Sequence, residues 1–213
     1  MSLSFVQEFI KVYPEFRIQP VINDMIIIKG RFTKILIHET HGKVYIDYSL
    51  SFYVPNGYPD QLPEVYEESG LIVNDPSNHV NYDGSFCLGA PIRLKLLLKK
   101  NASLIYFFEE SVLPYLYAVT LKKNMGKSFI FGELEHGNRG LLDDYKSFFH
   151  LQENPQVYQM LRILSSLKKE GNKLLCPCGC KKRVTTCNYF KKVVLMRKLF
   201  KRTEWKSQLN LLQ

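Results

Sequence analysis

The clearest pattern of hydrophobic and polar positions lies at residues 44–54. Apolar and polar side chains alternate there with the two-residue period of a strand. The positions predicted to share one face are Val44, Ile46, Tyr48, Leu50, Phe52 and Val54, with Asp47, Ser49 and Ser51 on the other. Further strands are predicted at 25–28, 35–37 and 63–67, and we expect the first two of these to be joined near Gly30.

Other segments repeat apolar residues at the three-to-four spacing of a helix. Helices are predicted on this basis at 3–13, 104–112, 141–149 and 157–164. Pro114 should break or bend the second of them, and Gly171 with Asn172 should end the last. Residues 69–91 hold too many glycines and prolines for a regular element, so we expect an irregular flap. A helix, an antiparallel meander, a flap and then helices make an α+β fold.

The length of 213 residues suits one main domain with an appendage. The predicted parts are a main domain at 1–125, a helical extension at 126–172 and a basic, cysteine-rich tail at 173–213. No apolar run reaches the length of about 20 residues that spans a bilayer, and residues 1–8 lack the blocks of a secretory signal. We therefore expect a cytoplasmic protein with no membrane partner and with reduced cysteines.

The positive charge is concentrated near the end of the chain. Residues 168–206 carry 13 Lys and Arg against two acids, whereas the other residues carry 16 basic and 18 acidic groups. A basic tail can bind nucleic acid or an acidic protein surface through charge. It can equally be a solvated helical face.

Cys87 stands apart from the other four cysteines, which cluster at 176–187. It follows Tyr82-Asp83-Gly84, a turn signal, so it should lie on a loop. A thiol on a constrained loop is a candidate nucleophile. The alternative is a small buried hydrophobic residue.

The segment around Cys87 resembles the ubiquitin-conjugating enzyme family. The resemblance covers roughly residues 1–120 and rests on Tyr58-Pro59, Pro63 and the run Gly84-Ser85-Phe86-Cys87-Leu88. In that family a strand ends in a Tyr-Pro segment, and a flap leads to a Gly-x-Ile-Cys-Leu run with the thioester cysteine. The family's His-Pro-Asn triplet aligns with Ser77-Asn78-His79, which puts His79 at the asparagine position, as in bacterial members of the superfamily.

The resemblance implies a ubiquitin-conjugating (UBC-like) fold and a transferase whose Cys87 forms a thioester with the C-terminus of a partner protein. The acyl group would then pass to an amine, with His79 either donating to the oxyanion, helping to deprotonate the attacking lysine, or ordering the flap. With its Cys-rich tail, the chain is similar to the stand-alone conjugating proteins of bacterial cyclic-oligonucleotide antiphage (CBASS) operons. There the acyl donor is the extended C-terminal tail of a cGAS-like nucleotide cyclase.

The chain carries no motif for adenylating that tail. Gly126-Lys127-Ser128 lacks the upstream glycine of a phosphate loop, and there is no Gly-x-Gly-x-x-Gly run. We therefore expect this chain to bind no ATP or other nucleotide. A separate activating enzyme, or a donor that is already activated, would load Cys87. Two other classes remain open: a non-catalytic module that binds a protein tail, and a nucleic-acid-binding protein acting through its basic tail.

The remaining cysteines have the spacing of metal ligands. In a reducing compartment, four thiols within twelve residues predict structural zinc rather than disulfides. The predicted ligands are Cys176, Cys178, Cys180 and Cys187. The motif resembles the SEC-C type of zinc tail, in which Cys176, Cys178 and Cys187 match three ligand positions and Asn188 falls on the fourth. Cys180 replaces a serine of that family, and the alternatives are that it completes the site or that the knuckle holds no metal.

Overall fold

The computed structural model describes residues 2–21, 23–38, 42–126 and 138–212. They fall into two compact units, Met1–Glu133 and Leu134–Gln213. The first unit is mixed α+β, and its elements in chain order include α1 (Ser2–Val12), β1 (Arg17–Ile18), β2 (Met25–His38), β3 (Gly42–Pro55) and β4 (Glu64–Glu67). The strands form one antiparallel sheet in the order β1-β2-β3-β4. The predicted α+β class is confirmed.

The alternation predicted for residues 44–54 gives β3 one fully buried face, since its six apolar positions are each less than 5% exposed. The segments 25–28 and 35–37 are not separate strands, because β2 runs unbroken through Gly30. A Cβ atom at Gly30 would lie 2.7 Å from the carbonyl oxygen of Glu15 and 2.8 Å from Cα of Phe16. Glycine is needed here for a close backbone approach and not for a turn.

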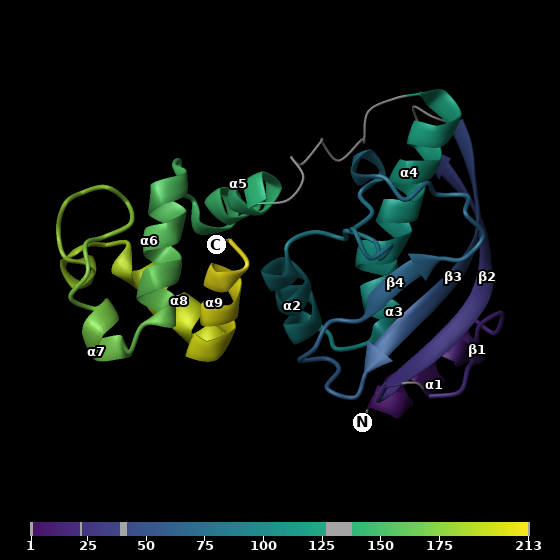
Figure 1. Cartoon of the computed structure of the whole chain (residues 1–213), viewed down its shortest axis with the longest axis horizontal. Helices are drawn as coiled ribbons and strands as arrows, with labels where there is room; N and C mark the ends of the chain where they lie inside the picture. The colour runs from purple at the N-terminus through teal and green to yellow at the C-terminus, as the bar shows by residue number, and fades with distance from the viewer. Residues whose placement is uncertain (1, 22, 39–41, 127–137, 213) are drawn as a thin grey trace. The chain divides into compact units, whose positions relative to one another are not determined.

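The flap that follows β4 contains the 3-10 turn η1 (Pro76–Asn78) and then leads to α2 (Pro91–Lys100). The α2 helix is missing from the sequence prediction. The next helical segments are α3 (Leu104–Phe107), the π-helical turn η2 (Phe108–Val112) and α4 (Leu113–Met125). Figure 1 shows α3 and α4 as one nearly continuous column beside the sheet. The amide of Leu113 donates to Phe108 five residues back, so the wider turn accommodates Pro114, which has no N–H, without breaking the helix.

The helices α1 and α4 cover the buried face of the sheet, and their aromatic side chains interlock with those of the strands. Phe9 of α1 lies 5.4 Å from Phe52 of β3 and 5.6 Å from Phe108, measured between ring centroids. The hydroxyls of Tyr48 and Thr120 hydrogen-bond at 3.0 Å and tie α4 to β3. The core therefore fixes the helical column against the sheet.

The second unit is helical and contains α5 (Asn138–Phe149), α6 (Asn154–Ser165), α7 (Lys168–Gly171), α8 (Phe190–Leu199) and α9 (Arg202–Asn210). The helix α6 packs against the other four. It ends at Ser165, and Gly171 closes the separate helix α7, so the predicted end of the 157–164 helix at Gly171-Asn172 is wrong. Each helix in the described ranges is too short or too polar to reach across a lipid bilayer.

Candidate functional site

Cys87 lies at the base of a tight hairpin formed by residues 79–87. Val80 and Phe86 pair as an antiparallel bridge, and the amide of Asn81 donates to the carbonyl of Ser85 at 2.8 Å. Gly84 closes the turn with a φ of +87°, a conformation that favours glycine. The predicted turn at 82–84 is confirmed, and Cys87 follows it on a loop.

Side chains inside the hairpin fix its shape. The carboxylate of Asp83 accepts from the amide of Ser85 at 3.0 Å and from its hydroxyl at 2.7 Å. These two bonds, the hydroxyl first, lower the pKa of Asp83. The side-chain amide of Asn81 donates to the same hydroxyl at 3.0 Å. The ionised form of Asp83 therefore holds the turn together.

The hairpin brings both predicted catalytic residues, Cys87 and His79, to its open end. The amide of Cys87 donates to the carbonyl oxygen of His79 at 2.7 Å. Cys87 is partly exposed, whereas the side chain of His79 is buried at 6% exposure. His79 has a left-handed backbone, with φ +53°, and ends η1. The backbones are thus opposite each other, and the burial of the imidazole suits an ordering role better than contact with a substrate from solvent.

The hairpin is anchored to the sheet and to α4. The amide of Phe86 donates to the carbonyl of Val65 in β4 at 2.8 Å, and the ring of Phe86 packs 4.3 Å from that of Tyr115, centroid to centroid. The hydroxyl of Tyr115 donates to the carbonyl of Asn78 at 2.9 Å. Burial is the main cause that raises the pKa of Tyr115. The column that carries Tyr115 thus holds the loop that presents the thiol.

A second residue of α4 secures the start of the same loop. The ammonium group of Lys122 donates to the carbonyl and hydroxyl oxygens of Ser77. Neither Tyr115 nor Lys122 is among the sequence-predicted site residues, because no local pattern relates α4 to a loop about 40 positions earlier.

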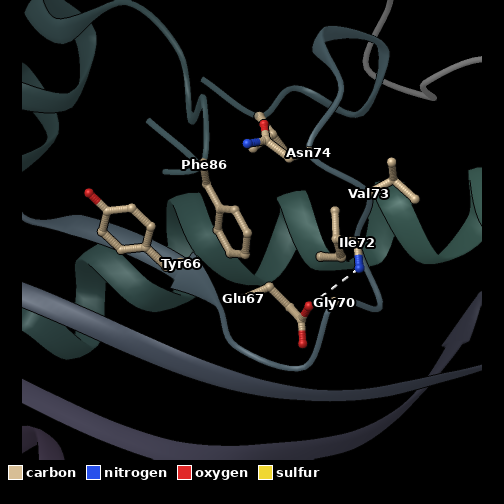
Figure 2. A pocket seen from close by; sticks show the side chains of 9 residues that line it. Tyr66, Glu67, Gly70, Ile72, Val73, Asn74 and Phe86 are labelled. Carbon is tan, nitrogen blue, oxygen red and sulfur yellow. Dashed lines mark hydrogen bonds between the residues drawn. The ribbon is translucent and has the colours of Figure 1, made fainter. Parts of the chain in front are cut away.

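A pocket of about 390 Å³ lies between the flap, β4 and this hairpin. Figure 2 shows the rings of Tyr66 and Phe86 and the side chain of Ile72 around it. The carboxylate of Glu67 accepts hydrogen bonds from three flap amides, those of residues 69, 71 and 72. These bonds fix the part of the flap that lines the pocket. Since Phe86 directly precedes Cys87, one wall of the pocket is continuous with the segment that carries the thiol.

The second unit gathers the four remaining cysteines into one cluster. Their Sγ atoms all lie within 4.8 Å of one another. Cys176, Cys178 and Cys180 come from a turn closed by Gly179, with φ +82°, and Cys187 lies between η3 (Val184–Thr186) and α8. The amide of Cys176 donates to the carbonyl of Lys182 at 2.8 Å and closes the knuckle. The four predicted ligands are therefore brought together.

The four sulfurs are close enough to hold one metal ion. Metal–sulfur bonds of about 2.3 Å place ligand sulfurs about 3.8 Å apart. The Sγ atoms are 3.2 Å apart for Cys176 and Cys178, and 3.6 Å apart for Cys178 and Cys187. The amide of Tyr189 points to Cys187 Sγ at 3.5 Å and is the first cause that lowers the pKa of that thiol to about 7. Burial raises the pKa of Cys176 and Cys178 instead, and a cation bound among the sulfurs would offset this cost of ionising the two thiols.

The knuckle rests on a packed helical support. The hydroxyl of Tyr189, two residues after Cys187, donates to the carbonyl of Phe149 at 2.7 Å. Trp205 is fully buried against the rings of Phe149 and Phe200. The ligand loop is therefore held by the core of its unit.

Comparison of the chain with known protein families, with curated proteins and with solved structures finds no match in any of the three. The geometry of the two sites therefore carries the functional argument. Lys127 and Ser128 of the Gly126-Lys127-Ser128 run, which the sequence excludes as a phosphate loop, lie outside the described residues.

Proposed function

We propose that the first unit is a ubiquitin-conjugating-like domain in which Cys87 carries an acyl group as a thioester. The observation that supports this most directly is a partly exposed thiol on a hairpin anchored by both the sheet and α4. The order of elements also agrees with that family: a helix, a four-stranded meander, a flap, the cysteine and then helices. An anchored nucleophile meets its electrophile with little loss of orientational freedom.

The proposed reaction has two acyl transfers. The Cys87 thiolate attacks the carbonyl carbon at the C-terminus of a donor protein that arrives activated, as a thioester or an acyl adenylate. A carbon–sulfur bond forms, and the donor's thiolate or phosphate leaving group departs. An amine then attacks the same carbon, loses a proton, and releases Cys87 as the thiolate. The structure supplies the presentation of the thiol, and the donor supplies the activation.

For His79 we propose a positioning role. Its carbonyl already accepts from the amide of Cys87, and His79 is buried rather than exposed to solvent. Replacing His79 by asparagine should preserve more acyl transfer than replacing it by alanine, because an amide can restore a hydrogen bond within the loop. If the imidazole were a catalytic base, both substitutions would reduce transfer to a similar extent, and the pH dependence of the transfer rate would disappear with the imidazole.

The proposed donor is the extended C-terminal tail of a partner protein. The resemblance to the CBASS conjugating proteins suggests a cGAS-like nucleotide cyclase, which would place the chain in bacterial antiphage defence. The pocket of about 390 Å³ beside the hairpin offers room for one side chain of an extended segment. No residue of this chain specifies the sequence of that tail.

The decisive experiment is co-expression of the chain with its genomic neighbours, followed by intact mass spectrometry. The proposal requires a covalent adduct on Cys87 that hydroxylamine cleaves. A Cys87→Ser chain should hold the donor as a more stable oxyester, and a Cys87→Ala chain should form no adduct. Adduct on the alanine variant would disprove the assignment. Retained, non-covalent binding of the donor with no adduct in any variant would support the alternative of a tail-binding module.

For the second unit we propose a structural zinc site formed by Cys176, Cys178, Cys180 and Cys187. The closeness of the four sulfurs and the amide directed at Cys187 support it. Four protein ligands leave no position for water, so the ion would stabilise the fold of the tail and not catalyse. Metal analysis after chelator treatment and reconstitution should give one zinc per chain, and a stoichiometry near zero would contradict the site.

A second candidate function for this unit is nucleic-acid binding. Lys181, Lys182 and Arg183 are all exposed beside the cysteine cluster. Phosphate contacts by such residues would make the affinity for generic DNA fall steeply with salt. Binding that is weak and insensitive to salt would exclude this role.

A further inference from the structure

The four cysteines of the cluster differ in how far solvent can reach them. Cys176 is buried at 5% exposure, Cys178 and Cys187 are half-buried, and Cys180 is exposed. Cys180 lies in a turn between Gly179, with φ +82°, and Lys181, with φ +59°. Of the four ligand residues, Cys180 is therefore the one that a small molecule from solvent reaches most readily.

The surroundings of Cys180 favour attack on peroxides. Lys181, Lys182 and Arg183 follow it directly and are exposed. Cationic side chains near the sulfur stabilise the hydroxide that leaves during its oxidation. The other sulfurs lie within 4.8 Å, so a second thiolate is within reach of an oxidised Cys180 after a side-chain rotation.

We propose that Cys180 is a peroxide-sensitive ligand whose oxidation opens the metal site. Its sulfur attacks one oxygen of hydrogen peroxide, the O–O bond breaks, hydroxide leaves, and Cys180 becomes a sulfenic acid. The thiolate of Cys187 then attacks that sulfur and displaces a second hydroxide. The resulting disulfide has given up two electrons to peroxide, and the two oxygens end as water once protonated.

Cys187 is the expected partner because it enters the cluster from a different segment. A disulfide between Cys180 and Cys178 would close a strained ring over a single intervening residue, whereas Cys187 lies seven positions away, directly after η3. Loss of two thiolates leaves the ion with two sulfur ligands, which is too few to retain it. A thiol reductant would restore all four ligands. The inference rests on the proposed zinc site.

The test uses the full chain loaded with zinc, in a Cys87→Ser background so that every remaining thiol belongs to the cluster. Zinc content is measured first. Hydrogen peroxide is then added, while zinc release is followed with a chromogenic chelator and the disulfide is located by peptide mapping. The expected result is zinc release together with a Cys180–Cys187 disulfide, both reversed by dithiothreitol and zinc. In a Cys180→Ser chain that still binds zinc, release should be at least about tenfold slower, because exposure governs the first oxidation.

A second experiment labels the thiols of the chain with all four cluster cysteines intact. It therefore does not require a Cys180 variant that still binds zinc. N-ethylmaleimide should modify Cys180 first and Cys176 last in the zinc-loaded chain. Equal labelling of all four, or oxidation that begins at Cys176, would overturn the inference. A chain that binds zinc and keeps it in peroxide contradicts this inference alone. A chain that never takes up zinc contradicts the zinc site, and the inference falls with it.

Discussion

Two tyrosines of the first unit differ in whether their hydroxyl group has a hydrogen-bond partner, so the same substitution can be compared at both positions. The hydroxyl of Tyr115 donates to the carbonyl of Asn78 at 2.9 Å. The hydroxyl of Tyr58 is buried and has no hydrogen-bond partner among the described residues. Replacing either tyrosine by phenylalanine removes one oxygen atom and keeps the ring. The two substitutions should nevertheless change stability in different directions.

The magnitude follows from what each oxygen leaves behind. Tyr115→Phe removes a neutral hydrogen bond and leaves the half-buried carbonyl of Asn78 with one partner fewer, so the unit should lose about 1–2 kcal/mol. The ring contact with Phe86, at 4.3 Å between centroids, is retained. Tyr58→Phe removes a hydroxyl that was desolvated without compensation, so stability should be unchanged or rise by up to about 1 kcal/mol.

The assay is hydrogen exchange at the hairpin, where the amides of Phe86 and Cys87 are protected by bonds to Val65 and His79. Since about 1.4 kcal/mol corresponds to tenfold in an equilibrium, these amides should exchange about five- to thirtyfold faster in Tyr115→Phe. In Tyr58→Phe they should exchange at the normal rate or more slowly.

Fluorescence provides a control in the other unit. Trp205, the only tryptophan, is fully buried there. The unfolding midpoint of the second unit, followed by the fluorescence of Trp205, should not move in either variant. The prediction is wrong if Tyr115→Phe leaves the exchange rate of the Cys87 amide unchanged, or if both substitutions lower the free energy of unfolding by the same amount.

Three further outcomes are expected for the first unit. Gly30→Ala should cost about 1–3 kcal/mol in urea unfolding, because its Cβ would press on backbone atoms that cannot move aside; a neutral result would contradict the close approach. The pKa of Asp83 is lowered in the folded chain, so its contribution to stability is complete above the unfolded pKa of about 3.9 and is lost as pH falls through the folded pKa. Asp83→Asn should remove this acid dependence. Hydrogen exchange at the hairpin that stays equally sensitive to acid in the variant would refute the prediction. Val73 lines the pocket, so Val73→Trp should slow adduct formation severalfold if the donor occupies the pocket. Leu71 lies on the same flap but does not line the pocket, so Leu71→Trp should leave the rate unchanged. Equal rates for the two variants would exclude the pocket from donor binding.

The parts of the fold that the sequence predicts correctly are those with a local cause. The alternation at 44–54 needs only a sheet with one buried face, and β3 has it. The predicted division of β2 at Gly30 is wrong. The glycine is required because the backbone of residues 15–16 packs closely against it, and no local pattern in the sequence encodes that contact. The sequence does not predict α2 because Pro91 ends a segment rich in glycine and proline. In the structure Pro91 occupies the first helical turn, where its missing N–H costs nothing.

The same division holds for the candidate sites. The cysteine cluster is predictable because its four ligands lie within one short segment, and their sulfurs do converge. The turn before Cys87 is predictable from Asp83 and Gly84. The anchoring of that turn is not, because Tyr115 reaches it from 37 positions away in the chain. Such contacts depend on how α4 packs on the sheet, which is decided by the whole core.

The two candidate chemistries reside in different compact units, and this makes them separable by experiment. Cys87 is held by contacts within the first unit, and the cysteine cluster is held by contacts within the second. Cys87→Ser should therefore leave zinc stoichiometry unchanged, and Cys180→Ser should leave the adduct on Cys87 intact when the donor binds only the first unit. If the Cys180 variant loses the adduct while the hairpin amides of the first unit keep their normal exchange rates, the cysteine-rich tail itself must take part in recognising the donor. That outcome would move the tail from a structural role to part of the binding surface.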